Sequence, residues 1–246
     1  MKSKEKKVIS LFSGAGGFDI GFAEAGFETA VMVEMDESCC KTLRLNCPNV
    51  PIINADIRTL TTEDILRSAN LRIGEAAVVM GGPPCQSFSL AGKRMGMEDP
   101  RGGLVLEFVR VVREALPLAF VMENVKGMVN WQGGKAMSAI LDEFKEPVEY
   151  QGEKYQYEVQ WKVMNAAEYG APQFRERVIL VGNRIGKKFE YPNPTHGKST
   201  GLFDNELQPY ATVADAIGQL PPSDEPSDVA KRVSGTIKKR ILKHGY

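Results

Sequence analysis

The sequence predicts an α/β fold built on a doubly wound, mostly parallel sheet with one antiparallel strand. Over the first half of the chain, short apolar runs typical of buried strands alternate with helical segments. Later, two β-rich runs at residues 157–165 and 177–182 follow each other without a full helix between them. Such a pair most simply forms antiparallel strands, which places one reversed strand in an otherwise parallel sheet.

The first half of the chain supplies five of the expected strands and the helices between them. Strands are expected at residues 8–11, 29–34, 50–54, 76–80 and 118–122. Helices are expected from the Gly-rich turn to residue 25 and at residues 36–46, 61–68 and 101–116. Asp36 is a typical capping residue for the second helix, and Pro117 stops the fourth.

After Asn183 the composition shifts toward Pro, Gly, Asn and Asp, and only residues 212–220 and 229–243 look helical. We therefore expect one domain at residues 1–185 and an extension at residues 186–246 that lacks a core of its own.

The composition is that of an ordinary globular protein. Of 246 residues, 43% are hydrophobic and 25% are charged, and the 31 Lys and Arg balance the 31 Asp and Glu. The longest apolar runs are far too short to span a bilayer, and the Lys-rich N-terminus leads into a strand rather than a signal peptide. We therefore expect a cytoplasmic protein without a membrane partner.

Cysteine usage separates one thiol from three others. None of the four cysteines forms a Cys-x-x-Cys pair and only two histidines are present, so neither a metal site nor a disulfide framework is expected. Cys39, Cys40 and Cys47 lie on or just after a predicted helix, as small buried residues do. Cys85 instead follows Gly-Gly-Pro-Pro at the carboxyl end of a predicted strand, where α/β sheets place their ligands and chemistry. The two prolines give this thiol a stiff mounting.

A Gly-rich turn at residues 12–18 follows the first predicted strand and opens a helix. Such a turn lets a ligand approach the backbone near a helix N-terminus. The dinucleotide fingerprint is not met, because Asp19 occupies the place of its third glycine. A pyrophosphate ligand, and with it a nicotinamide oxidoreductase, is therefore disfavoured.

Acidic residues end the next two strands. Glu34 lies twenty residues after Gly14, where a carboxylate can accept both hydroxyls of a ribose. Asp56 follows the third strand, where it can accept a hydrogen bond from the amino group of adenine. With the Gly-rich turn, these acids suit an adenosine ligand that carries a small zwitterionic tail.

Three further charged residues point to chemistry at the same edge. Glu123 ends the fifth strand and would lie beside the Cys85 strand if the two are adjacent, so that a thiol nucleophile and a proton donor face one crevice. Arg175 and Arg177 alternate along an entering strand and should project from one face, where paired arginines suit phosphate and base-oxygen contacts. Taken singly, Glu123 reads as a structural acid and the arginines as surface ion pairs.

Together these residues resemble the DNA (cytosine-5) methyltransferases, over about residues 7–185. The matching elements occur in the family's order, and the last three are highly specific as a set. They are Phe12-Ser13-Gly14-x-Gly16-Gly17, Glu34, Asp56, Gly82-Pro83-Pro84-Cys85-Gln86, Glu123-Asn124-Val125 and Gln173-x-Arg175-x-Arg177. The resemblance implies the Rossmann-like fold of methyltransferases that use S-adenosylmethionine.

The resemblance also implies a substrate and a role for each residue. The methyl donor is S-adenosylmethionine, no metal takes part, and the acceptor is a cytosine flipped out of duplex DNA. Cys85 adds to carbon 6 of the base, Glu123 acts at ring N3, Arg175 holds the O2 side, and Arg177 supports the site or contacts backbone. Residues 87–101 would form a mobile loop that closes over DNA. The donor pocket would contain Phe12, Ser13, Gly14, Gly16, Gly17, Glu34, Met35, Asp56, Ile57, Pro84 and Leu104.

One departure from the family's pattern concerns the end of the sequence. Single-chain members continue into a target-recognition domain and a late Gln-x-Gly-Asn segment that completes the donor pocket, and these 246 residues contain neither. Residues 212–220 resemble the segment just before that domain. A truncated copy or one subunit of a split enzyme would explain this, and the basic helix expected at the end favours a complementing subunit.

We expect methylation within a restriction–modification system. The alternatives are an RNA cytosine methyltransferase and a non-catalytic S-adenosylmethionine-binding or regulatory remnant. The intact set of Cys85, Glu123 and Arg175 argues against a silent protein.

Overall fold

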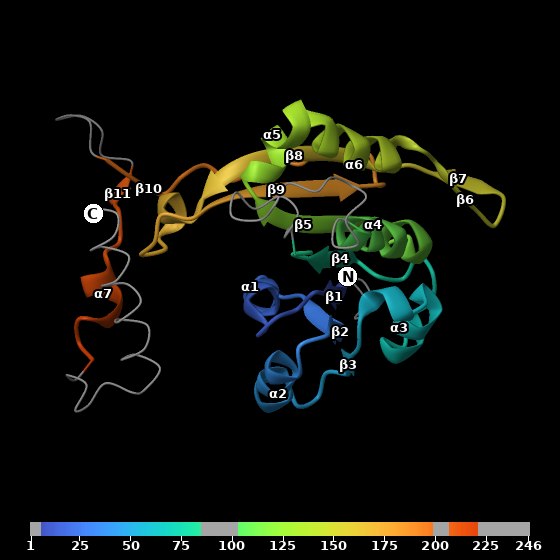
Figure 1. Cartoon of the computed structure of the whole chain (residues 1–246), viewed down its shortest axis with the longest axis horizontal. Coiled ribbons are helices and arrows are strands. Elements are labelled where there is room, and N and C mark those ends of the chain that lie inside the picture. Colours follow the sequence, from blue (N-terminus) through green and yellow to red (C-terminus); the bar gives the residue numbers. More distant parts are fainter. Residues whose placement is uncertain (1–5, 85–102, 199–206, 221–246) are drawn as a thin grey trace.

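A seven-stranded sheet in the order β3-β2-β1-β4-β5-β9-β8 organises the computed structural model, which describes residues 6–84, 103–198 and 207–220 (Figure 1). The strands are β1 (Lys7–Leu11), β2 (Glu28–Glu34), β3 (Ile52–Asn54), β4 (Val78–Gly81), β5 (Ala119–Val125), β8 (Glu158–Asn165) and β9 (Glu176–Asn183). The pairs from β3 to β5 are parallel, whereas β9 is antiparallel to both β5 and β8. The predicted fold class, with one reversed strand, is confirmed.

Helices pack on both faces of this sheet. They are α1 (Gly17–Glu24), α2 (Glu37–Asn46), α3 (Thr62–Ser68), α4 (Gly103–Ala115), α5 (Gly127–Asn130) and α6 (Lys135–Lys145). Alternate residues of the strands face opposite sides. Val8 and Met80 pack with Phe18 and Phe22 of α1, whereas the side chains on the other face join the large core formed with α3, α4 and α6.

An aromatic cluster anchors that larger core. The rings of Phe120 on β5 and Phe144 on α6 are stacked with centroids 4.2 Å apart, and Phe108 of α4 and Tyr157 meet Phe120 edge to face. The Tyr157 hydroxyl donates a hydrogen bond to the Pro117 carbonyl at 2.7 Å, and burial raises the pKa of this phenol. The cluster therefore joins the crossover helix α4, the strand β5 and α6 into one unit.

Two regions differ from the sequence-based expectations. The third strand begins at Ile52 rather than residue 50, because the Val50 N–H donates to the Cys47 carbonyl and belongs to the preceding turn. Residues 127–155, for which no element was predicted, contain α5, α6 and the hairpin of β6 (Val148–Tyr150) and β7 (Glu153–Tyr155). The apolar spacing of α6 is helical, with Ala136, Met137, Ile140 and Phe144 buried.

After β9 the chain returns along the sheet. Arg184 donates to the carbonyls of Leu116 and Pro117 at the end of the sheet where β5 begins. The Tyr191 hydroxyl then donates to carbonyls of β8 and β9, and the Thr195 N–H donates to the Glu168 carbonyl, next to the end of β8. The extension is therefore carried back to the edge where the parallel strands end.

Beyond this return lie the short parallel pair β10 (His196–Gly197) and β11 (Gln208–Pro209) and the helix α7 (Val213–Ile217). Thr212 and Asp215 form a reciprocal capping box at its start, so the predicted helix at 212–220 is present but shorter. Figure 1 shows α7 standing apart from the sheet. The helix predicted at 229–243 lies outside the described residues. No helix in the described part of the chain is long and apolar enough to cross a membrane.

We predict that Gly182→Ala destabilises the fold. Gly182 is paired with Phe120 across β5 and β9, and a Cβ at this position would overlap the Phe120 ring. The substitution should lower the free energy of unfolding, measured by urea denaturation, by about 1–3 kcal/mol because it overpacks the aromatic cluster.

The matched control is Gly21→Ala, on the exposed surface of α1. A Cβ there meets no atom within 4 Å, so this change should raise stability by about 0.5–1 kcal/mol through helix propensity. Equal stability of Gly182→Ala and the wild type would contradict the packing described here.

Candidate active site

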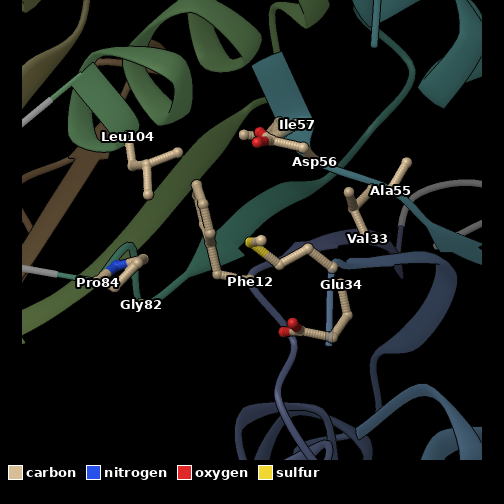
Figure 2. A pocket seen from close by; sticks show the side chains of 10 residues that line it. Phe12, Val33, Glu34, Ala55, Asp56, Ile57, Gly82, Pro84 and Leu104 are labelled. Carbon is tan, nitrogen blue, oxygen red and sulfur yellow. The ribbon is translucent and has the colours of Figure 1, made fainter. Parts of the chain in front are cut away.

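The carboxyl ends of β1, β2, β3 and β4 surround a cavity of about 240 Å³ (Figure 2). Because these strands are parallel, residues at their ends converge on one edge of the sheet. Leu104, in the first turn of α4, closes the cavity on the remaining side. The cavity is lined by Phe12, Val33, Glu34, Met35, Ala55, Asp56, Ile57, Gly82, Pro84 and Leu104.

The Gly-rich turn departs sharply from β1. Phe12 has a φ of 54°, in the left-handed region that side chains with a Cβ rarely adopt, and its ring projects into the cavity toward Leu104. Gly14 and Gly16 also have positive φ values, of 54° and 88°. A Cβ on Gly16 would lie 3.0 Å from Leu43 of α2, so glycine is needed there for both conformation and space.

Glu34 at the end of β2 holds this turn in place. One carboxylate oxygen, Oε2, accepts the Gly14 N–H at 2.8 Å, and the other, Oε1, accepts the Asp36 N–H at 2.8 Å. Asp36 in turn caps α2 by accepting the Cys39 N–H at 2.9 Å. A carboxylate offers about four acceptor positions, so Glu34 retains capacity for hydroxyl groups of a ligand.

Met35 and Asp56 also line the cavity. The Asn54 amide donates to the Glu34 and Met35 carbonyls at 3.2 and 3.0 Å and leaves the Met35 side chain 61% exposed. Both Asp56 oxygens accept from Arg58 Nε at 3.0 Å, and these hydrogen bonds lower the pKa of Asp56. This acid is therefore ionised near neutral pH, and any ligand amino group must share it with Arg58.

Seven of the eleven residues predicted for the donor pocket line this cavity: Phe12, Glu34, Met35, Asp56, Ile57, Pro84 and Leu104. Ser13, Gly14, Gly16 and Gly17 do not line it; they form the adjoining turn, and the Ser13 hydroxyl faces inward toward Ser10. The lining residues that were not predicted are Val33, Ala55 and Gly82. Each is a direct sequence neighbour of a predicted residue or motif at a strand end, which is the signal that could have found them.

A second group of side chains lies next to the cavity, where β5 ends. β4 and β5 are parallel neighbours, as the prediction for Glu123 required. The Glu123 carboxylate pairs with Arg177 Nε at 2.7 Å, and both side chains are about one quarter exposed. A Cβ on Gly82 would lie 3.1 Å from Glu123 Oε2. Gly82 therefore separates the cavity from the Glu123–Arg177 pair.

The two arginines are not equivalent. β9 begins at Glu176, so Arg175 directly precedes the strand and Arg177 is its second residue. The expectation that both arginines project from one face stays a prediction. The backbone N–H of Arg175 donates to Asn165 Oδ1 at 3.0 Å, and its exposed side chain makes no such pair with Glu123 within the described residues. Of these two arginines, Arg177 is the one that pairs with the Glu123 carboxylate.

Asn124 has a positioning role that the sequence did not reveal. It is 2% exposed, its Nδ2 donates to the Pro83 carbonyl at 3.1 Å, and its Oδ1 accepts the Val125 N–H at 2.8 Å. The end of β5 therefore holds the Pro83-Pro84 segment. Cys85, which follows directly in the sequence, and the predicted loop at 87–101 lie outside the described residues.

The other cysteines behave as structural residues. Cys40 is fully buried and donates its thiol to the Glu34 carbonyl, and burial raises the thiol pKa of Cys39, Cys40 and Cys47. A raised pKa disfavours the nucleophilic thiolate. Within residues 6–84, 103–198 and 207–220, no three His, Cys, Asp or Glu side chains are grouped so as to hold a metal ion.

Comparison with known proteins extends this picture. The model of the C-5 cytosine-specific DNA methylase family matches residues 6–240. The type II methyltransferase M.AquIA of Picosynechococcus sp. is 62% identical, over 98% of this chain and 100% of that protein. The type II methyltransferase M1.HphI of Haemophilus parahaemolyticus is 41% identical, over 87% of this chain but only 52% of that protein.

Among solved structures, a DNA modification methyltransferase encoded within an Escherichia coli prophage is similar, with a TM-score of 0.68 and 28% identity. The match covers 88% of this chain and 56% of that one, so this chain spans about half the length of this structure and of the Haemophilus relative. The family match, the identity to the Picosynechococcus protein and the site geometry agree, and the chain belongs to the C-5 cytosine-specific DNA methylase family.

Proposed function

We propose that this protein transfers a methyl group from S-adenosylmethionine to carbon 5 of a cytosine in duplex DNA. The observation that carries the proposal is the adjacency of the two sites at Gly82 and Pro84. Both residues line the cavity at the ends of β1 to β4, and Gly82 also approaches Glu123. A methyl donor in the cavity and a cytosine bound at Glu123 would therefore be neighbours, separated by one short backbone segment.

The donor half of the proposal rests on the cavity. Glu34 would accept the ribose hydroxyls, while Met35, Ile57 and Asp56 would surround the adenine. The Gly-rich turn at residues 13–17 would face the zwitterionic tail, near the N-terminus of α1.

The acceptor half rests on Cys85 and Glu123. The Cys85 thiolate would add to carbon 6 of the cytosine while Glu123 hydrogen-bonds to or protonates ring N3. Carbon 5 would then attack the methyl group of S-adenosylmethionine, and the neutral thioether S-adenosylhomocysteine would leave. Loss of the carbon 5 proton would expel Cys85 and release 5-methylcytosine. The base must leave the stack for the sulfur to reach it.

The arginines would complete the acceptor half. Arg177 binds Glu123 Oε1, which would orient Oε2 toward the base on the Gly82 side. Arg175 would contact the O2 side of the cytosine, since its side chain is exposed next to Phe174. These roles use planar, permanently charged donors, for which arginine is suited.

We further propose that the enzyme is the modification methyltransferase of a restriction–modification system. The support is that the Picosynechococcus and Haemophilus relatives are named type II methyltransferases. Its place of action would be the cytoplasm, at the nucleoid in a bacterium.

Residues 1–185 would be the catalytic domain, and residues 186–246 an extension that meets a complementing subunit. Val213, Ile217 and Leu220, which we call the α7 face, are 55–66% exposed, and α7 buries no side chain within the described residues. The partner would carry the target-recognition domain and the final segment of the donor pocket. The 52% coverage of the Haemophilus relative leaves room for such parts in the family.

We predict that Cys85→Ala abolishes methylation. Without the thiolate, carbon 5 is not activated, so incorporation of labelled methyl into duplex DNA should fall by at least about a thousand-fold. Covalent trapping by 5-fluorocytosine DNA should be lost as well. Cys39→Ala, on an α2 position outside the cavity, is the matched control and should behave like the wild type. Trapping retained by Cys85→Ala would place the nucleophile elsewhere. If the wild type transfers the labelled methyl group to transfer RNA and not to DNA, the substrate is RNA.

We predict that Glu123→Gln slows methyl transfer by about a hundred- to ten-thousand-fold, the usual contribution of a positioned acid–base group. Binding of S-adenosylhomocysteine should stay unchanged, because Glu123 does not line the cavity. Glu149→Gln, in an exposed ion pair with Lys154 on the β6–β7 hairpin, provides the control. Full activity of Glu123→Gln would exclude the role proposed for this carboxylate.

We predict that Ile217→Asp prevents complementation. A charge on the α7 face should abolish co-purification with the proposed complementing subunit and the DNA methylation that depends on it. Donor binding by the chain should be unaffected, and Ala214→Asp, on the same helix but off this face, should still assemble. Normal assembly of Ile217→Asp would show that the partner binds elsewhere.

A further inference from the structure

Asp19 is a buried acid that the proposed chemistry does not use. It lies in the first turn of α1, is 4% exposed, and does not line the cavity. Its Oδ2 accepts the Ser10 hydroxyl of β1 at 3.0 Å, and its Oδ1 accepts the Thr29 hydroxyl of β2 at 3.0 Å. Burial raises the pKa of Asp19, so the protein has placed an acid where an apolar side chain would be less costly to bury.

The Asp19 carboxylate is connected to the Gly-rich turn. The Ser10 and Ser13 hydroxyl oxygens are 2.9 Å apart, and both side chains are almost fully buried. The Ser13 N–H donates to the Val33 carbonyl at 3.2 Å, and the next residue, Gly14, donates to Glu34. One line of contacts therefore runs from Asp19 through Ser10 and Ser13 to Gly14, whose N–H donates to the Glu34 carboxylate in the cavity.

The charge on Asp19 determines which group donates in the hydrogen bond between Asp19 and Ser10. An ionised carboxylate only accepts hydrogen bonds, so Ser10 must use its single hydroxyl proton toward Asp19. The Ser10 oxygen can then only accept from Ser13, whose hydroxyl also lies 3.2 Å from the Ser10 carbonyl and 3.5 Å from the Val33 carbonyl. In each of these arrangements the Ser13 hydroxyl donates to β1 or β2. An amide at position 19 could donate as well as accept and would remove this constraint. The positive end of the α1 dipole favours the ionised form.

We propose that Asp19 is a positioning residue of the donor site, which rests on the function proposed above. Through Ser10 and Ser13 it holds the Gly-rich turn in the conformation in which Gly14 reaches Glu34 before the donor arrives. Preorganisation of this kind lowers the ordering cost of binding, so its loss weakens donor affinity. The methyl-transfer step, which takes place beyond Gly82, keeps its rate.

The test measures the affinity of the full chain for S-adenosylhomocysteine by calorimetry, together with the melting temperature of each variant. Asp19→Asn should raise the Kd by about tenfold, which is about 1.4 kcal/mol. In the methylation assay the donor KM should rise similarly, with kcat unchanged. Ser10→Ala should reproduce the effect, and the double variant should be no weaker than either single one, because both break the same line of contacts.

Thr29→Val is the matched control. It removes the partner of Oδ1 and leaves Ser10, Ser13 and the Asp19 carboxylate in place. It should lower the melting temperature to a similar extent as Asp19→Asn while preserving the Kd. An unchanged Kd in Asp19→Asn, or an equal rise in Thr29→Val, would overturn the inference and leave Asp19 as a fold-stabilising group.

Glu34→Gln separates this inference from the donor-site proposal on which it rests. It removes the carboxylate of the cavity itself and should weaken S-adenosylhomocysteine more than Asp19→Asn does. If the wild type binds S-adenosylhomocysteine neither alone nor together with the complementing subunit, both proposals fail. If Glu34→Gln weakens binding and Asp19→Asn does not, only the role of Asp19 is overturned.

Discussion

β4 lies between β1 and β5, and its two parallel pairings place the rest of the site. The strand is short and fully buried, and it ends at Gly81, which Gly82 directly follows. A Cβ on Gly81 would lie 2.5 Å from the Leu11 carbonyl oxygen of β1, and one on Gly82 would press on Glu123 of β5. The strand end is therefore held between the backbone of β1 and the Glu123 carboxylate of β5. Displacing β4 by one residue would separate the cavity from Glu123.

The reversed strand β9 brings residues from the start of a strand to the site edge. Parallel strands deliver only their last residues to the site edge, whereas an antiparallel strand delivers its first. Arg177 pairs with Val125 at the point where β9 begins and β5 ends. Its Nε therefore lies 2.7 Å from the Glu123 carboxylate. Lys126 pairs in the same way with Glu176 at 2.7 Å. Two ion pairs, Glu123–Arg177 and Lys126–Glu176, therefore join the end of β5 to the start of the antiparallel strand β9.

Much of this arrangement was predictable from the sequence because it depends on where strands end. Apolar runs located the strands, and the parallel order then brought Glu34, Asp56 and Glu123 to one edge. The distinction between Arg175 and Arg177 was not predictable, because strand alternation does not say at which residue pairing with β5 begins. Nor was the role of Asn124, whose amide acts on the backbone of Pro83, forty-one residues away in sequence. The apolar spacing of α6 is regular and is sufficient to predict a helix there, but the helix contributes no side chain to the cavity.

The path of the chain after β9 determines where the last part of the sequence starts relative to the site. Residues 184–198 run the length of the sheet a second time, guided by Arg184, Tyr191 and Thr195, and finish beside Glu168 at the site edge. Any polypeptide joined to or docked on the residues that follow starts from the same rim as the cavity and Glu123. The return segment therefore fixes the point from which the following residues start, relative to the cavity and Glu123.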